Sequence, residues 1–170
     1  MSTLASRVLG SATLRVGSYE EVEADHNANW QAAAVVILSS LGAAVGVRVT
    51  SPADVAILLI VAVATWISWV LLTLLIGTVL LPGNQTKADF GQLFRTTGFS
   101  SAPGVLRAFG FLPYVGGFII AVATFWMLLS FVVAVRQALD YSSTGRAFLV
   151  CLLGWLIQGI LFFGFIAVAL

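Results

Sequence analysis

Charged residues are scarce in this chain, and so are the residue types that build most metal and redox sites. Of 170 residues, 9% are charged and 60% are apolar, whereas an ordinary soluble domain has about a quarter charged residues. Such an inventory cannot cover a solvated surface, so we expect an integral membrane protein. The single Cys and the single His exclude a disulfide framework and a zinc cluster built from several Cys and His ligands.

An excess of positive charge is also missing. Eight Lys and Arg residues stand against seven Asp and Glu residues, which gives a net charge of +1. Without a basic surface there is no electrostatic footprint for nucleic acid. We therefore expect no nucleic-acid partner, no cofactor and no metal, and the composition indicates no catalytic reaction.

The polar part of the chain is residues 1–29, which hold four of the seven acids and the only His. We expect no cleavable signal here, because Arg7 and Arg15 interrupt any apolar run. Leu4, Val8 and Ala12 recur at helical spacing, a pattern typical of a helix that lies on a membrane surface. Residues 1–29 are thus predicted to form a short interfacial or cytoplasmic helical tail.

A second helix is predicted within this tail. Ser18 followed by Glu21 is typical of a capping box, so an acidic helix should begin near Tyr19. A metal site at Glu21, Asp25 and His26 is disfavoured, since neighbouring side chains on a helix point about 100° apart. We expect a solvated face instead, or carboxylates that contact basic side chains. The candidate contacts are Glu20, Glu21 and Asp25 with Arg95, Arg136 or Arg146.

Five apolar stretches follow the tail and predict an all-α, polytopic helical membrane bundle. The expected spans are residues 30–47, 55–81, 90–112, 114–135 and 147–170, each near or above the length needed to cross about 30 Å of hydrocarbon. Ser51, Pro52 and Asp54 supply an N-cap, a first-turn proline and an early acid, which predict where the second span begins. We expect one domain, residues 30–170, preceded by the tail.

The third stretch, 90–112, leaves two alternatives open. Arg95 and Arg107 enclose eleven uncharged residues, about 16 Å of helix, which favours a re-entrant half-helix. A short true span is also possible if both Arg side chains extend to the interfaces. Pro103 and Gly104 should kink the helix in either case.

Basic residues indicate the number of crossings through the positive-inside rule. Four spans would place five of the eight Lys and Arg residues on the cytoplasmic side, and five spans would place six there. Five spans are therefore favoured, with the N-terminal tail in the cytoplasm and Leu170 on the opposite face.

Polar groups inside the predicted spans are few. Thr65, Trp69 and Thr73 share one helix face beside Trp66, and we expect this face to pack against Trp126. Core packing is the simpler interpretation. A groove for a small molecule or lipid is the alternative, and an open cavity lined by Trp66, Trp69 and Trp126 would indicate it.

Three further positions, Gly42, Gly46 and Gln158, are expected to serve helix packing, and Cys151 is expected to be inert. Gly42 and Gly46 form a small-xxx-small pair, which favours close approach of another helix of the same chain over a dimer contact. Gln158 should hydrogen-bond between helices. Cys151 should be an inert buried thiol.

Segments 95–103, 112–116 and 141–147 together resemble the Yip1 domain, a family of five-span membrane proteins. They carry an arginine, a glycine-aromatic pair and a small-proline pair, then a proline-glycine turn, then the loop before the last span. The acidic run 19–25 is similar to prokaryotic members. The family-motif candidates are Arg95, Gly98, Pro103, Pro113, Gly116 and Arg146.

This resemblance implies five helices with a cytoplasmic N-terminus. Eukaryotic relatives act in vesicle traffic and contact small Rab-type GTPases. Because this tail is short and the motifs are of the prokaryotic type, GTPase contact is not inferred. The resemblance offers no catalytic residue to transfer.

We therefore expect a non-enzymatic membrane scaffold or accessory subunit in a prokaryotic inner membrane. Its partners would be the lipid bilayer and other membrane proteins or a second copy of the chain. The alternative is a small permease or lipid-handling protein that uses the Thr65, Trp66 and Trp69 face and the Pro103–Gly104 break. A continuous polar cavity that reaches Gly104 would favour this alternative.

Overall fold

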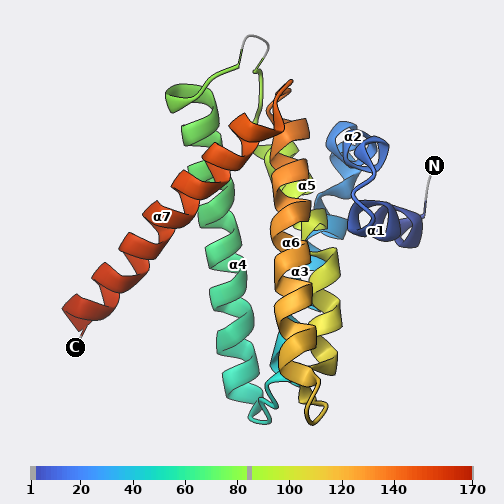
Figure 1. Cartoon of the computed structure of the whole chain (residues 1–170), viewed down its shortest axis with the longest axis vertical. Helices are drawn as coiled ribbons and strands as arrows, with labels where there is room; N and C mark the ends of the chain where they lie inside the picture. The colour runs from blue at the N-terminus through green and yellow to red at the C-terminus, as the bar shows by residue number, and fades with distance from the viewer. Residues whose placement is uncertain (1–2, 84–85, 170) are drawn as a thin grey trace.

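A computed structural model describes residues 3–83 and 86–169, and within this part of the chain every element is helical. Figure 1 shows the arrangement. The elements, in chain order, are α1 (Leu4–Ala12), α2 (Val16–Ala24), the 3-10 turn η1 (His26–Ala28), α3 (Asn29–Gly46), α4 (Pro52–Leu75), the π-helical η2 (Ile76–Leu80), α5 (Phe90–Ser100), the 3-10 helix η3 (Ala102–Phe111), α6 (Gly116–Ala138) and α7 (Thr144–Ala169).

Four helical stretches in the described residues are long and apolar enough to cross a membrane. They are His26–Gly46, Pro52–Leu80, Gly116–Ala138 and Thr144–Leu161. Each overlaps one predicted span, which supports a multi-pass membrane protein. The cap of the second span is formed as expected: Ser51 is the N-cap and its Oγ accepts from the Asp54 N–H, with Pro52 in the first turn.

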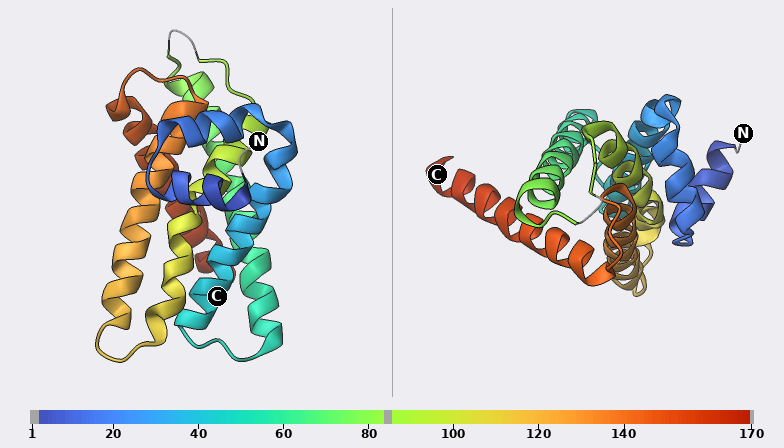
Figure 2. Two further views of the ribbon diagram at one scale, coloured as in Figure 1. Left: turned by 90° about the vertical axis from the view of Figure 1, so that its right-hand side faces the viewer. Right: turned by 90° about the horizontal axis from the view of Figure 1, so that it is seen from above.

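The ambiguous stretch forms two helical pieces, α5 and η3, that run one after the other along the bundle. Figure 2 shows that they continue in one direction toward the end of the bundle where α6 begins, so the segment does not turn back as a re-entrant half-helix would. The break lies at Ser101, between the two pieces. Pro103 has no N–H to donate to the preceding turn, so an undisturbed α-helix cannot continue through it.

Helices α3, α5, η3 and α6 form the compact part of the bundle, whereas α7 diverges from it. In Figure 1 α7 crosses the top of α4 and α6 and then runs outward, so that the C-terminus lies far from the other helices. The large apolar side chains of Ile160 and Leu161 on its second half are exposed. The core therefore lies between the first six helices and the first part of α7, which contributes Ala147, Val150 and Cys151.

The N-terminal tail folds back against the side of the bundle (Figure 2). Leu4, Val8 and Ala12 pack against the hydrophobic core, so the apolar stripe of α1 faces the protein's own helices. The expectation that this stripe contacts a membrane surface was wrong. A periodic apolar face marks burial, and it does not say whether lipid or protein covers the face.

The predicted capping box was also wrong. Helix α2 begins at Val16, with Arg15 as N-cap and no side-chain cap. Leu14 adopts a φ of 61° in the turn between α1 and α2, so the chain reverses sharply and the new helix starts at once. Ser18 therefore lies inside α2 and packs closely against Gly10. A Cβ added at Gly10 would lie 2.0 Å from Ser18 Oγ.

Candidate functional site

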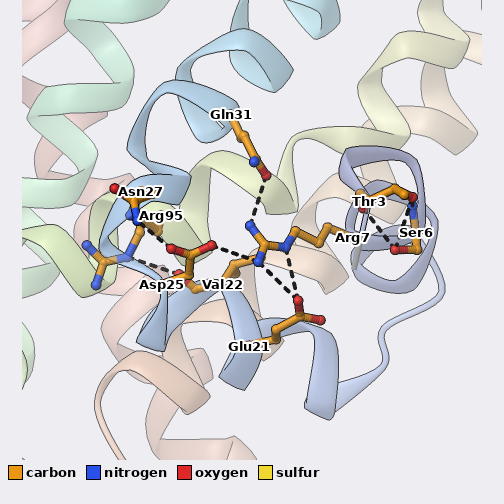
Figure 3. A network of polar contacts seen from close by, with 9 residues as sticks. All are labelled: Thr3, Ser6, Arg7, Glu21, Val22, Asp25, Asn27, Gln31 and Arg95. Atoms are coloured by element: carbon orange, nitrogen blue, oxygen red, sulfur yellow. Dashed lines mark hydrogen bonds and ion pairs between the residues drawn. The ribbon is translucent and has the colours of Figure 1, made fainter. Parts of the chain in front are cut away.

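An ion-pair network around Arg7 holds the helices of the N-terminal tail together (Figure 3). Its guanidinium pairs with Glu21 at 3.0 Å and with Asp25 at 2.7 Å, and it donates to Gln31 Oε1 at 3.0 Å. Arg7 joins α1 to α2 and to the start of α3. The hydrogen bond from Arg7 holds the pKa of the Asp25 carboxyl below its usual range.

Arg95 ties the tail to α5. Its side chain is 1% exposed, and it donates from Nε to the Val22 carbonyl at 3.0 Å, from Nη2 to the Glu23 carbonyl and from Nη1 to Asn29 Oδ1 at 3.2 Å. The expected pairing of tail carboxylates with Arg95 was wrong, because Glu21 and Asp25 pair with Arg7 on α1. Arg95 instead binds carbonyls at the end of α2, where the helix leaves carbonyl groups free.

The other two expected basic partners also bind carbonyl oxygens. Arg136 donates to the Tyr141 carbonyl at 3.2 Å, and Arg146 donates to the Pro82 carbonyl at 3.1 Å, with its guanidinium 5.7 Å from the Tyr141 ring. Glu20 accepts from Gln137 Nε2 at 3.3 Å. These contacts stabilise the loops at the end of the bundle that lies beside the N-terminal tail. Among the described residues, no group of three His, Cys, Asp or Glu side chains could hold a metal ion.

Two aromatic side chains, Tyr19 and Trp126, join the tail to α6. Tyr19 is fully buried, and its hydroxyl lies 3.0 Å from the Ser11 carbonyl and 3.3 Å from the Ser130 carbonyl. Burial raises the pKa of the Tyr19 phenol. Trp126 Nε1 donates to the Ala12 carbonyl at 2.7 Å, so Trp126 faces the tail and the expectation that it packs against Thr65 and Trp69 was wrong.

Among the carboxyl groups outside the membrane-spanning segments, that of Glu23 has the most strongly shifted pKa. Partial burial raises its pKa to about 7, and nearby Asp140 adds to this effect by like-charge repulsion, while Arg95 opposes it. Glu20 and Asp89 add smaller repulsions. The tail end of the bundle therefore contains a carboxyl whose charge changes near neutral pH.

A cavity of about 320 Å³ opens between α3, α4, η3 and α6. Thr65, Trp66 and Trp69 line it, as the groove interpretation expected, and Trp126 is absent from its wall. Trp66 Nε1 donates to Thr97 Oγ1 at 3.0 Å, and the Trp69 ring makes edge contacts with Phe131 and Trp155. Thr73 is buried one turn beyond Trp69, outside this wall.

Arg107 on η3 lines the same cavity. Nε donates to the Gly104 carbonyl at 3.1 Å, and Nη2 donates to the carbonyl and hydroxyl of Ser39 at 3.1 and 3.0 Å. The side chain therefore turns into the bundle, and the expectation that it extends to the interface was wrong. The carbonyl and hydroxyl of Ser39 on α3 are the acceptors that hold the guanidinium inside the bundle.

The glycines singled out from the sequence lie where backbones meet. A Cβ at Gly42 would lie 2.9 Å from the Val105 carbonyl oxygen, and one at Gly46 would lie 2.0 Å from that of Arg107. Gly98 packs against Ala32 and Trp66, and Gly116 against Gly110. The pair on α3 thus contacts η3 of the same chain. Pro103 is buried beside this contact, and Pro113 is exposed at the turn before α6.

Gln158 joins α7 to α4. Its Oε1 accepts from Ser68 Oγ at 2.9 Å, an interhelical hydrogen bond of the kind that membrane helices use. Cys151 is buried near the start of α7.

The Yip1 domain family model matches residues 16–166, which include α2, the bundle and nearly all of α7. The chain belongs to the Yip1 domain family. Neither a curated protein nor a solved structure matches the chain. The Yip1 match covers the Arg95 contact with α2 and the cavity, whereas α1 lies before the matched residues. Yip1 domains form a membrane family that is not known as enzymatic.

Proposed function

We propose that this Yip1 protein is a non-enzymatic membrane scaffold or accessory subunit that works through helix contacts with other membrane proteins. The observation that carries the proposal is the divergence of α7 (Figure 1). Ile160 and Leu161 on its second half are 71% and 57% exposed, and Cβ atoms at Gly159 and Gly164 would meet no neighbour within 4 Å. Small residues between large apolar ones allow another membrane helix to approach closely.

The proposed topology has five spans, a cytoplasmic N-terminal tail and an opposite-facing C-terminus, in a prokaryotic inner membrane. It rests on the distribution of basic residues and on the continuous path of α5 and η3 along the bundle. A permease is disfavoured because Gly104, which a continuous passage would need to reach, is closely packed. A Cβ there would lie 2.1 Å from Ser39 Oγ and 2.6 Å from Met127 Sδ.

Site-specific photo-crosslinking in membranes tests the scaffold role. A photoreactive amino acid in place of Ile160 should give a crosslinked protein, which mass spectrometry then identifies as another membrane protein or a second copy. Phe118 on α6, 73% exposed, is the matched control, since the proposal assigns no contact to it. Crosslinks from residue 160 to lipid alone, together with a strictly monomeric particle in mild detergent, would contradict the proposal.

A further inference from the structure

Arg107 places a positive charge deep within the bundle. Its Nη2 lies 3.0 Å from Ser39 Oγ, and Ser39 is ten residues after the start of α3 at Asn29 and seven before its end at Gly46. At about 1.5 Å of rise per residue, Ser39 lies about 10 Å from the nearer end of the helix. A charge at such depth is costly unless a partner compensates it.

The bundle supplies no carboxylate as that partner. Within residues 3–83 and 86–169, no Asp or Glu oxygen lies within ion-pair distance of Arg107, and Nη1 donates to no residue. Asp54 borders the same groove but is exposed at the start of α4. It lies eight residues from Ala62, about 12 Å along the helix. The guanidinium therefore has both an open donor and an uncompensated charge.

Two further hydroxyl donors line the cavity that Arg107 enters. The hydroxyls of Thr65 and Ser101 line the cavity with it and make no hydrogen bond to any described residue. Guanidinium and hydroxyl groups can all donate to one oxyanion, and bonds to an ionised acceptor are about twice as strong as neutral ones.

An apolar groove continues from this polar cavity. Arg107, Ser40 and Ala62 line both the cavity and a second space of about 450 Å³ between α3 and α4. The remaining wall of that space is mostly aliphatic, with Ile57, Leu58 and Val61. One ligand could thus place a charged group at Arg107 and an apolar chain along α4.

We propose that this site binds an amphipathic anion, a carboxylate or phosphate group attached to an apolar chain. Arg107 pairs with the anionic head, Thr65 and Ser101 donate to it, and the chain lies in the groove between α3 and α4. The proposal does not depend on the scaffold role, because it rests on the uncompensated charge and the two connected spaces. It assigns binding, and no transport, to this face.

Native mass spectrometry of the delipidated full chain in detergent tests the proposal. The probes are oleate, phosphatidylglycerol, oleyl alcohol and inorganic phosphate, titrated separately. A single saturable adduct with oleate or with phosphatidylglycerol is expected, and the stronger of the two identifies the source of the anion. Equal binding of oleyl alcohol, binding of inorganic phosphate alone, or no saturable adduct would each overturn the proposal.

Variants locate the adduct. Arg107→Gln should weaken binding at least tenfold, whereas Arg48→Gln should leave it unchanged, since Arg48 is an exposed arginine that donates to the Phe111 carbonyl. Ala62→Phe places a ring where the two spaces meet and should also abolish binding with Arg107 intact. It keeps the test valid if Arg107→Gln does not fold, as judged by elution volume and thermal unfolding. Undiminished binding by a folded Arg107→Gln or Ala62→Phe variant contradicts the assignment.

Discussion

At the scale of single residues, buried arginines determine how the polar parts of the chain attach to the bundle. Arg7 pairs with Glu21 and Asp25, Arg95 satisfies the carbonyls at the end of α2, and Arg107 donates to the carbonyl and hydroxyl of Ser39 on α3. Guanidinium suits these positions because its planar donors reach several acceptors at once. Each of these contacts joins two different elements of the fold.

Replacing Arg95 with Gln should release the tail. The change leaves the Val22 and Glu23 carbonyls and Asn29 short of donors in a buried position, a loss of about 2 kcal/mol or more. Limited proteolysis after Glu20, Glu21 and Glu23 should become faster, and the thermal unfolding midpoint should fall. Lys87→Gln is the control, because Lys87 is exposed. Equal protection of the tail in both variants would show that Arg95 does not hold it.

Glu23 should make tail docking dependent on pH. Its pKa is raised to about 7 in the folded protein from an ordinary value of 4.5, mainly by burial. The folded state therefore binds the proton more tightly than the unfolded state, so stability is fully present below about 4.5 and falls as the pH rises through about 7. Glu23→Gln should raise the unfolding midpoint at pH 8 and have little effect at pH 4.5. Repulsion from Asp140, and weaker repulsion from Glu20 and Asp89, acts over the same pH range. Glu20→Gln therefore serves as a comparison. If Glu20→Gln raised the unfolding midpoint at pH 8 as much as Glu23→Gln does, the pH dependence could not be assigned to Glu23.

At the scale of elements, α3 and η3 pack with their backbones in direct contact. Gly42 and Gly46 let the backbone of η3 approach α3 directly, so the small-residue pattern in the sequence marked a real contact surface. The partner could not be deduced from it, because close approach requires small residues on one helix and says nothing about which helix approaches.

Gly46→Ala should weaken this contact. The new methyl group would lie 2.0 Å from the Arg107 carbonyl oxygen, a backbone atom that cannot move without shifting η3, so a loss of about 1–3 kcal/mol is expected. Gly159→Ala is the matched control, since nothing lies within 4 Å of its added Cβ and alanine favours a helix interior. Thermal unfolding in one detergent compares them. A midpoint for Gly46→Ala equal to that of Gly159→Ala would mean that η3 adapts.

The elements show which parts of the fold sequence reasoning can reach. Apolar runs and the Ser51 cap predicted α3, α4, α6 and α7, because span length and caps are local signals. The start of α2 was misplaced, since the sharp turn at Leu14 overrode the Ser18 pattern. The direction of Arg107 was also missed, because its acceptors on α3, the carbonyl and hydroxyl of Ser39, come near it only in the folded bundle.

At the scale of the whole molecule, the site depends on long-range contacts that local patterns do not contain. The Trp66 and Trp69 wall of the cavity followed from helical spacing on one element. Trp126, on another helix, was assigned to that wall only because of its residue type, and the structure turns it toward α1. A single sequence does not indicate which residues on different membrane helices contact each other. These contacts can be identified only from the folded structure.

Reporter fusions should verify the proposed number of crossings. With five spans, a periplasm-dependent reporter fused after Leu170 should be active, and one inserted in the loop at Ser142 should be inactive. Ser142 lies between α6 and α7, so the two fusions differ by one helix. Activity at Ser142 with none after Leu170 would contradict the proposed topology, because it would indicate either four spans or the reverse orientation. Equal activity at both positions would mean that α7 does not cross.

The tail contacts also set an order of assembly. Tyr19 meets the Ser130 carbonyl and Ala12 meets Trp126, pairs separated by 111 and 114 positions in the chain. During synthesis, α1 and α2 leave the ribosome before α6, so the surface that receives them exists only after α6 has been made and inserted. These two helices therefore reach their final position only after most of the bundle has formed.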